Sequence, residues 1–191
     1  MKPAIIVVDM LKDGVGSNPT LKAKHEGVIW NIQRLLKESR SANIPIIYAC
    51  DSFLSQDFMF GGKMRSGPIR GTEGVEVIDE LAPEAGDMIL EKRRFSAFFR
   101  TDLDMTLRTL KVDMLVVCGM NTHVCVMLTA WDGLANDFRV VIIEDCCAAP
   151  RRELHDNAIR LYRKSPIYPL FRIITLDEFL KEIEHTRLLI D

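Results

Sequence analysis

Six short apolar runs limit what this chain can fold into more than any other feature of the sequence. The first, Ala4-Ile5-Ile6-Val7-Val8, contains no polar residue, and the others show little alternation. The runs span residues 4–8, 44–50, 88–90, 114–118, 139–143 and 171–174. Such runs suit strands that are buried on both faces, as in a parallel sheet covered by helices, better than strands with one face in water.

The stretches between these runs carry the spacing or the start signals of helices. Apolar residues recur at helical spacing in the first long stretch, where Ile32, Leu35 and Leu36 share a face. We expect helices over residues 20–41, 74–81, 101–110, from about 122 to 135, 151–164 and 176–183. Strands that alternate with helices predict an α/β fold. The expected architecture is one domain over residues 1–191, a doubly wound six-stranded parallel sheet with helices on both faces.

Composition excludes several classes of partner. The net charge of −2 gives no reason to expect nucleic acid or an anionic membrane surface. No apolar run approaches the ~20 residues that span a bilayer, and the apolar run before Asp9 is too short for a signal peptide. The cysteines form no CxxC pair, which suits reduced thiols and a cytoplasmic location. They are Cys50, Cys118, Cys125, Cys146 and Cys147.

Chemically active residues follow the first four apolar runs. Asp9 comes after the first, Asp51 after the second, Lys92 after the third and Cys125 shortly after the fourth. The carboxyl ends of parallel strands meet at one edge of a sheet, which is where such folds bind ligands. We therefore expect carboxylates, an ammonium and a thiol on the same edge.

The stretch from Val116 to Val126 contains the most reactive of these residues. It begins as an apolar strand, should break at Gly119, and then restarts as a helix with Cys125 in its first turn. The positive end of a helix dipole favours thiolate over thiol, and the thiolate is the nucleophile. This arrangement predicts a nucleophilic cysteine, with backbone N–H groups available for an oxyanion.

Each of these residues also has an ordinary structural interpretation. Asp9 could cap a loop, Lys92 could be a solvated charge, and Cys125 could be a small buried apolar residue. Their position at one edge favours a joint catalytic role.

Gly14-Val15-Gly16 follows the first run, but the third glycine of a dinucleotide fingerprint is replaced by Pro19, so no such cofactor is expected.

Four blocks of sequence together resemble the isochorismatase-like cysteine hydrolase family, which includes nicotinamidases, N-carbamoylsarcosine amidases and ureidoacrylate amidohydrolases. The resemblance runs from about residue 3 to 180. The blocks are Ile5-Ile6-Val7-Val8-Asp9 with Asp13, Glu91-Lys92-Arg93-Arg94-Phe95-Ser96-Ala97-Phe98, Thr101-Asp102-Leu103-Asp104, and Val117-Cys118-Gly119-Met120-Asn121-Thr122-His123-Val124-Cys125-Val126.

The resemblance implies a role for each matching residue. Cys125 would be the nucleophile, Asp9 the proton acceptor and donor, and Lys92 the cation that stabilises the thiolate. It also implies a cis peptide bond at Met120–Asn121. The backbone N–H groups of Asn121 and Cys125 would then form the oxyanion hole.

Departures from the family pattern reduce the number of activities that we expect for this chain. Nicotinamidases of the family bind a metal through an Asp-x-His pair after the second strand, where this chain reads Asp51-Ser52-Phe53. We expect no catalytic metal and no cofactor. The presence of Cys125 argues against the isochorismatases proper, which hydrolyse a vinyl ether and in some cases lack the cysteine.

The remaining branch is the metal-free, N-carbamoylsarcosine amidase-like one. The predicted activity is hydrolysis of a C–N amide or carbamoyl bond in a small polar molecule, such as a linear amide or ureido compound, through a thioester acyl-enzyme. The alternatives are an isochorismatase-type ether hydrolase, a nicotinamidase-like amidase, and a non-catalytic binding member of the family.

Four residues are candidates for substrate binding: Asp13, Phe53, Phe95 and Arg151. Phe53 lies in a long irregular stretch over residues 52–73, and such stretches in compact domains are usually functional. Packing is the alternative for both phenylalanines, and a solvated helix start is the alternative for Arg151. Members of the family usually form dimers or tetramers, so a homodimer or homotetramer is expected.

Overall fold

A computed structural model of the chain describes residues 1–17 and 19–188; residue 18 and residues 189–191, which belong to the expected domain, lie outside the described part. Its centre is one sheet of parallel strands in the order β3-β2-β1-β4-β5-β6. This confirms the expected six-stranded doubly wound sheet. The strands are β1 (Pro3–Val8), β2 (Ile46–Asp51), β3 (Met88–Lys92), β4 (Met114–Met120), β5 (Arg139–Ala148) and β6 (Phe171–Ile174).

The central strands are the most apolar, because they have neighbours on both sides and helices on both faces. Every residue of β4 is buried, as is every residue of β1 after Pro3. The chain runs from β1 outward to β3, then crosses back to β4 and continues to β6. The strand order therefore reverses between β1 and β4, and ligands of such sheets bind at that point, beyond the carboxyl ends.

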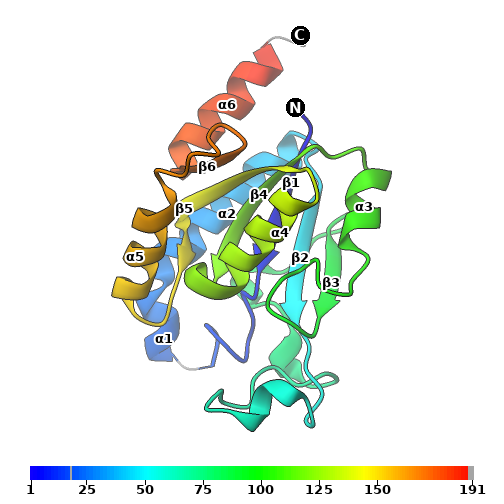
Figure 1. Cartoon of the computed structure of the whole chain (residues 1–191), viewed down its shortest axis with the longest axis vertical. Coiled ribbons are helices and arrows are strands. Elements are labelled where there is room, and N and C mark those ends of the chain that lie inside the picture. Colours follow the sequence, from blue (N-terminus) through cyan, green and yellow to red (C-terminus); the bar gives the residue numbers. More distant parts are fainter. Residues whose placement is uncertain (18, 189–191) are drawn as a thin grey trace.

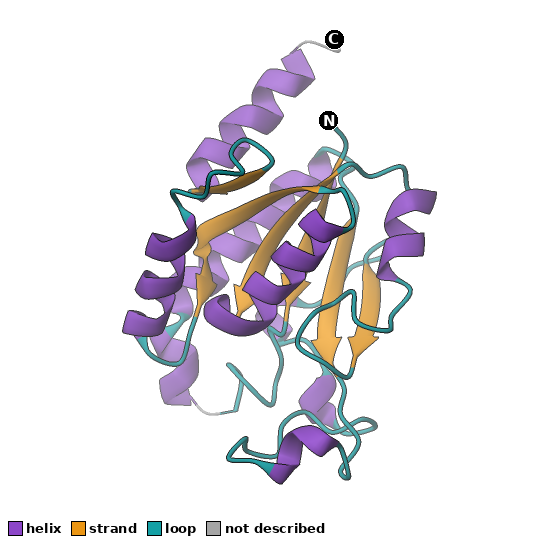
Figure 2. Cartoon of the chain, viewed as in Figure 1, coloured by secondary structure: helices purple, strands orange, loops and turns teal. Residues whose placement is uncertain are grey.

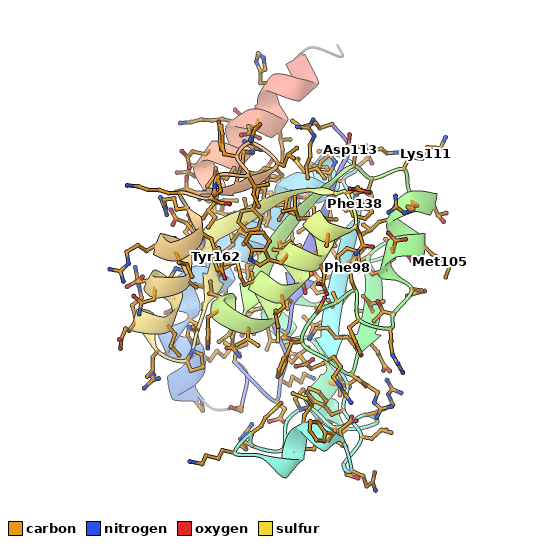
Figure 3. The ribbon with its side chains drawn as sticks, in the orientation of Figure 1. Phe98, Met105, Lys111, Asp113, Phe138 and Tyr162 are labelled. Carbon is orange, nitrogen blue, oxygen red and sulfur yellow. The ribbon has the colours of Figure 1, made fainter. Side chains whose placement is uncertain are left out.

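Helices cover both faces of the sheet, as Figure 1 shows with α4 in front and α2 behind. Helix α6 packs with α2, whereas α5 lies on the α4 side. In front, the ring centroids of Phe98 and Phe138 lie 6.0 Å apart (Figure 3). The helices are α1 (Pro19–Lys24), α2 (Glu26–Ser41), α3 (Leu103–Thr109), α4 (Met127–Ala135), α5 (Arg152–Tyr162) and α6 (Leu176–Leu188).

The helix expected over residues 74–81 is wrong. The structure has two short 3-10 turns, Glu73–Val75 and Asp79–Leu81, joined by an extended piece. The extended piece exchanges backbone hydrogen bonds with the segment after β1: Lys12 donates to Glu76, and Ile78 donates to Met10. These long-range bonds use backbone groups that a helix would have bonded internally.

The irregular segment over residues 52–73 projects beyond the carboxyl ends of β2 and β3 (Figure 2). It is tied to the sheet edge by Asp57, whose buried carboxylate forms an ion pair with Arg93 at 2.5 Å. Hydrogen bonds from Arg93 are the main reason that the pKa of Asp57 is lowered. The segment is thus attached to the residue that follows Lys92.

Candidate active site

The candidate site lies at the carboxyl edge, where β1, β2, β3 and β4 end next to one another. Asp9 follows β1 directly and has a left-handed backbone conformation with φ of 50°, which Asp tolerates better than most residues. Its backbone N–H donates to Ala49 on β2 at 3.0 Å. Its carboxylate receives two hydrogen bonds, from Lys92 Nζ to Oδ2 at 2.8 Å and from the backbone N–H of Asp51 to Oδ1 at 2.8 Å.

Lys92 is the cation of the site and is only 1% exposed. Its ammonium forms ion pairs with Asp9 at 2.8 Å and with Asp51 at 2.5 Å. Burial acts to lower the pKa of Lys92, but the negative charges of Asp9 and Asp51 and the hydrogen bond to Asp51 outweigh burial and raise it. The ammonium is therefore a fixed positive charge over the whole physiological range.

The thiol reaches the site on an unusual turn. We expect the strand to break at Gly119 from the sequence, but β4 continues through Gly119 to Met120. Gly119 has φ of +107°, and a Cβ on it would stand 2.1 Å from the backbone oxygen of Val8, so only glycine fits there. A π-helical turn, Thr122–Val126, then precedes α4 and carries Cys125.

Cys125 is 4% exposed, and its sulfur belongs to a compact group with two carboxylates. Its Sγ and one carboxylate oxygen each from Asp9 and Asp51 all lie within 4.8 Å of one another. Burial raises the pKa of the Cys125 thiol well above its usual value, the two carboxylates raise it further, and Lys92 lowers it only in part.

Burial and the two carboxylates oppose the thiolate that the helix start was expected to favour. The helix start was expected to supply the positive field, but the local balance is set by two carboxylates that share one ammonium. Desolvation and like charge both disfavour a second anion in such a place. These effects favour the thiol form of Cys125 until a base removes its proton.

Asp51 is the second carboxylate of this cluster, and its residue type and spacing alone predict no role for it. It is buried, and burial together with the charge of Asp9 raises its pKa to about 7, against the lowering effect of Lys92. The available signal was its place at the end of β2, in register with Lys92 on β3. A strand-end carboxylate beside a strand-end lysine in parallel register predicts an ion pair.

The peptide bond Met120–Asn121 is cis in the structure. Asn121 then begins the turn, and its carbonyl accepts from the N–H groups of Val124 and Val126 at 3.0 and 3.3 Å. This fixes the backbone around Cys125. The role of the Asn121 and Cys125 N–H groups toward an oxyanion stays a prediction.

The four candidates for substrate binding are spread around the site. Asp13 is paired with Arg65 at 2.6 Å. Phe53 is fully buried and contacts Phe60 edge-to-face at 5.4 Å between ring centroids, so its ring packs within the irregular segment.

The other two candidates differ in exposure. Phe95 is half-buried against the core, and Arg151 is exposed where α5 begins. Burial, and then the charge of Arg151, lower the pKa of His123 on the π-helical turn. Arg151 is thus electrostatically coupled to that turn, but its role toward a substrate stays a prediction.

A metal fits this group of residues poorly. The carboxylates of Asp9 and Asp51 and the thiol are close enough to share an ion by distance alone. The Lys92 ammonium, however, already bonds both carboxylates, and a divalent cation next to it would meet a like charge. Phe53 also offers no donor atom at the place where the metal-binding branch carries histidine.

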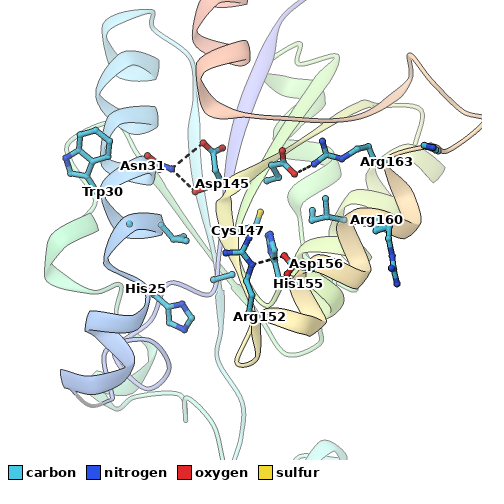
Figure 4. Close-up of a pocket in the computed structure, with 17 residues that line it drawn as sticks. His25, Trp30, Asn31, Asp145, Cys147, Arg152, His155, Asp156, Arg160 and Arg163 are labelled. Atoms are coloured by element: carbon cyan, nitrogen blue, oxygen red, sulfur yellow. Dashed lines mark hydrogen bonds and ion pairs between the residues drawn. The ribbon is translucent and has the colours of Figure 1, made fainter.

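A cavity of about 860 Å³ lies beside the candidate site, and its lining does not include Asp9, Lys92 or Cys125. Figure 4 shows it between the start of α2, with His25 and Trp30, and the α5 helix, with the end of β5 between them. His155 of its wall is hydrogen-bonded to Thr122 of the π-helical turn at 2.9 Å. The wall of the cavity is therefore linked to the turn that carries Cys125.

Fold and site together define a doubly wound α/β protein with a carboxylate, an ammonium and a thiol at the strand-order reversal. The family model for the isochorismatase domain matches residues 3–175. This chain belongs to the isochorismatase family. No helix within the described ranges is long and apolar enough to span a bilayer.

A sequence relative supports membership of the isochorismatase family. The ureidoacrylate amidohydrolase RutB of Serratia proteamaculans is 33% identical over 138 residues, which cover 62% of this chain and 56% of that protein. This chain therefore spans little more than half of that relative's length.

Two solved structures cover nearly the whole chain. An isochorismatase-like hydrolase from Alkaliphilus metalliredigens superposes with a TM-score of 0.86 and 30% identity, over 95% of this chain and 99% of that one. N-carbamoylsarcosine amidase from Thermoplasma acidophilum superposes with a TM-score of 0.78 and 30% identity, over 93% and 98%.

Proposed function

We propose that this protein is a metal-independent cysteine hydrolase that cleaves a C–N amide or carbamoyl bond of a small polar molecule. The observation that carries the proposal is the grouping of the Cys125 sulfur with the Asp9 carboxylate, which is itself hydrogen-bonded to the buried Lys92 ammonium. The relatives named ureidoacrylate amidohydrolase and N-carbamoylsarcosine amidase support this bond type.

The residues suggest a two-stage reaction. Asp9 takes the thiol proton of Cys125, the sulfur attacks the substrate carbonyl carbon, and the Lys92 charge offsets the negative charge that develops. The backbone N–H groups of Asn121 and Cys125 are the proposed oxyanion donors. The C–N bond breaks as protonated Asp9 returns its proton to the leaving nitrogen, which leaves a thioester on Cys125.

The second stage regenerates the protein. Asp9, again a carboxylate, takes a proton from water as the water oxygen attacks the thioester carbon. The C–S bond breaks, the acid product leaves, and the proton returns to the sulfur. Because the resting group is a thiol, this scheme needs a base beside it, and Asp9 is positioned for that task.

The test is a screen for release of ammonia or amine over linear amides and ureido acids, with Cys125→Ala as the blank. We expect turnover in the parent protein, none in the variant, and a thioester adduct trapped on Cys125 by mass spectrometry. Turnover retained by Cys125→Ala would contradict the mechanism.

Isochorismatase-type ether hydrolysis is the second candidate, and the match to the isochorismatase domain favours it. That reaction would need Asp9 as an acid but not the thiol. An activity that survives Cys125→Ala and is lost in Asp9→Asn would therefore identify it.

We further propose a cytoplasmic homodimer or homotetramer. All five cysteines are free and buried, which suits a reducing compartment. Trp30 is 57% exposed at the mouth of the 860 Å³ cavity, and large exposed aromatic residues are enriched at protein interfaces. Light scattering of the purified protein tests the assembly state.

A further inference from the structure

The proposed mechanism uses one carboxylate, but the structure places a second one against the same ammonium. The Asp51 carboxylate lies 2.5 Å from Lys92 Nζ, closer than the Asp9 carboxylate at 2.8 Å. Both acidic side chains are largely shielded from water. Burying an ionised carboxylate costs free energy, because the charge loses its hydration. The contacts of Asp51 must therefore offset that cost.

Asp51 holds the cluster through two different groups. Its side chain fixes the ammonium of Lys92, its register neighbour on β3. Its backbone N–H fixes the carboxylate of Asp9 at 2.8 Å. One residue thus orients both the acid–base group and the cation of the proposed reaction.

The charges around the sulfur follow from these contacts. With both carboxylates ionised and one ammonium, the cluster carries one net negative charge before the thiol loses its proton. Titratable or charged groups face Asp51 from each element packed around it. The groups are Asp9 just after β1, Lys92 and Glu91 from β3, Cys50 from β2 itself, Cys125 from the π-helical turn, and Arg70, which is hydrogen-bonded to Ser52 and paired with Glu91.

We propose that Asp51 is a positioning residue of this site, which anchors Lys92 and Asp9 and whose carboxylate, when ionised, opposes loss of the Cys125 proton in the free protein. The inference rests on the proposed function, in which Cys125 is the nucleophile. Its consequence is that the sulfur becomes reactive when Asp9 takes the proton, and is otherwise protected from alkylation.

The experiment measures the alkylation rate of Cys125 by iodoacetamide from pH 6 to 10, with the modified residue identified by peptide mapping. The variants are Asp51→Asn, which is nearly isosteric, and Asp51→Ser, which removes the charge with a smaller side chain. Glu91→Gln is the matched control, because it removes a carboxylate one residue from Lys92 that is paired with Arg70 instead.

We expect Cys125 in Asp51→Asn to react at least tenfold faster than in the parent at pH 8, with the profile moved to lower pH. A charge within about 5 Å at an effective dielectric constant of about 20 shifts an ionisation equilibrium by more than tenfold. Glu91→Gln should keep the parent profile. Asp51→Ser should follow Asp51→Asn, which covers the case in which Asp51→Asn fails to fold.

The outcomes separate this inference from the proposed function. An unchanged Cys125 profile in a folded Asp51 variant overturns the role of Asp51, whatever the substrate screen finds. A Cys125 that resists alkylation over the whole range in the parent and in every variant contradicts the nucleophile itself and overturns both. Circular dichroism of each variant checks that the fold is kept.

Discussion

The ionisation of Asp51 should make the stability of this protein fall as the pH rises. Its pKa is raised from an ordinary 3.8 to about 7 in the folded protein, mainly by burial and by Asp9. Between about pH 4 and pH 7 the folded state therefore holds one more proton at Asp51 than the unfolded state does. The free energy of unfolding falls with pH wherever the folded state binds more protons.

The size of the effect follows from the shift of roughly three pKa units. Each unit corresponds to about 1.4 kcal/mol, so the contribution of Asp51 amounts to about 4 kcal/mol. The cost is absent below about pH 4 and is fully present above about pH 7. Lys92 adds nothing in this window, because its raised pKa keeps it charged throughout and its stabilising effect is lost only at strongly alkaline pH.

The assay is urea unfolding at several pH values from 4.5 to 8, for the parent and for Asp51→Asn. Other groups also titrate in this range, so the informative quantity is the difference between the two proteins at each pH. We expect Asp51→Asn to gain stability relative to the parent by up to about 4 kcal/mol between the ends of the window. A difference that stays constant with pH would refute the argument that folding opposes the ionisation of Asp51.

Three further substitutions test other parts of the structure. Lys92→Met leaves two buried carboxylates without a cation, and should cost about 3–5 kcal/mol in urea unfolding and abolish turnover. Gly119→Ala forces a Cβ against the neighbouring strand at positive φ, and should lower stability by more than about 3 kcal/mol, measured by thermal unfolding. Thr129→Val removes the acceptor of the buried Ala97 N–H and should cost about 1–3 kcal/mol in the same assay.

Each of these substitutions has a control in the same chain. Lys37→Met removes an exposed lysine of α2 and should change stability by less than about 0.5 kcal/mol. Gly27→Ala meets no atom within 4 Å and should stabilise by about 0.4–1 kcal/mol. Thr129→Ser keeps the hydroxyl. Equal effects of a substitution and its control would contradict the contact on which that prediction rests.

Much of the fold was predictable because it depends on local pattern. The run Ile5-Ile6-Val7-Val8 is typical of a strand buried on both faces, and the register of β1 with β2 and β4 agrees. The expected helix over residues 74–81 failed for the opposite reason. Its backbone groups bond residues such as Met10, more than sixty positions earlier in the chain, and no local pattern reveals such partners.

The candidate site was also predictable only in part. The sequence by itself determined that Asp9, Lys92 and Cys125 follow successive strands and therefore meet at one edge, because parallel strands end on the same side of a sheet. Only the tertiary structure decided that Asp51 shares the ammonium and that burial and two carboxylates raise the pKa of Cys125. Protonation depends on burial and on the sum of charges from several strands and the π-helical turn, and that sum exists only after the elements have packed together.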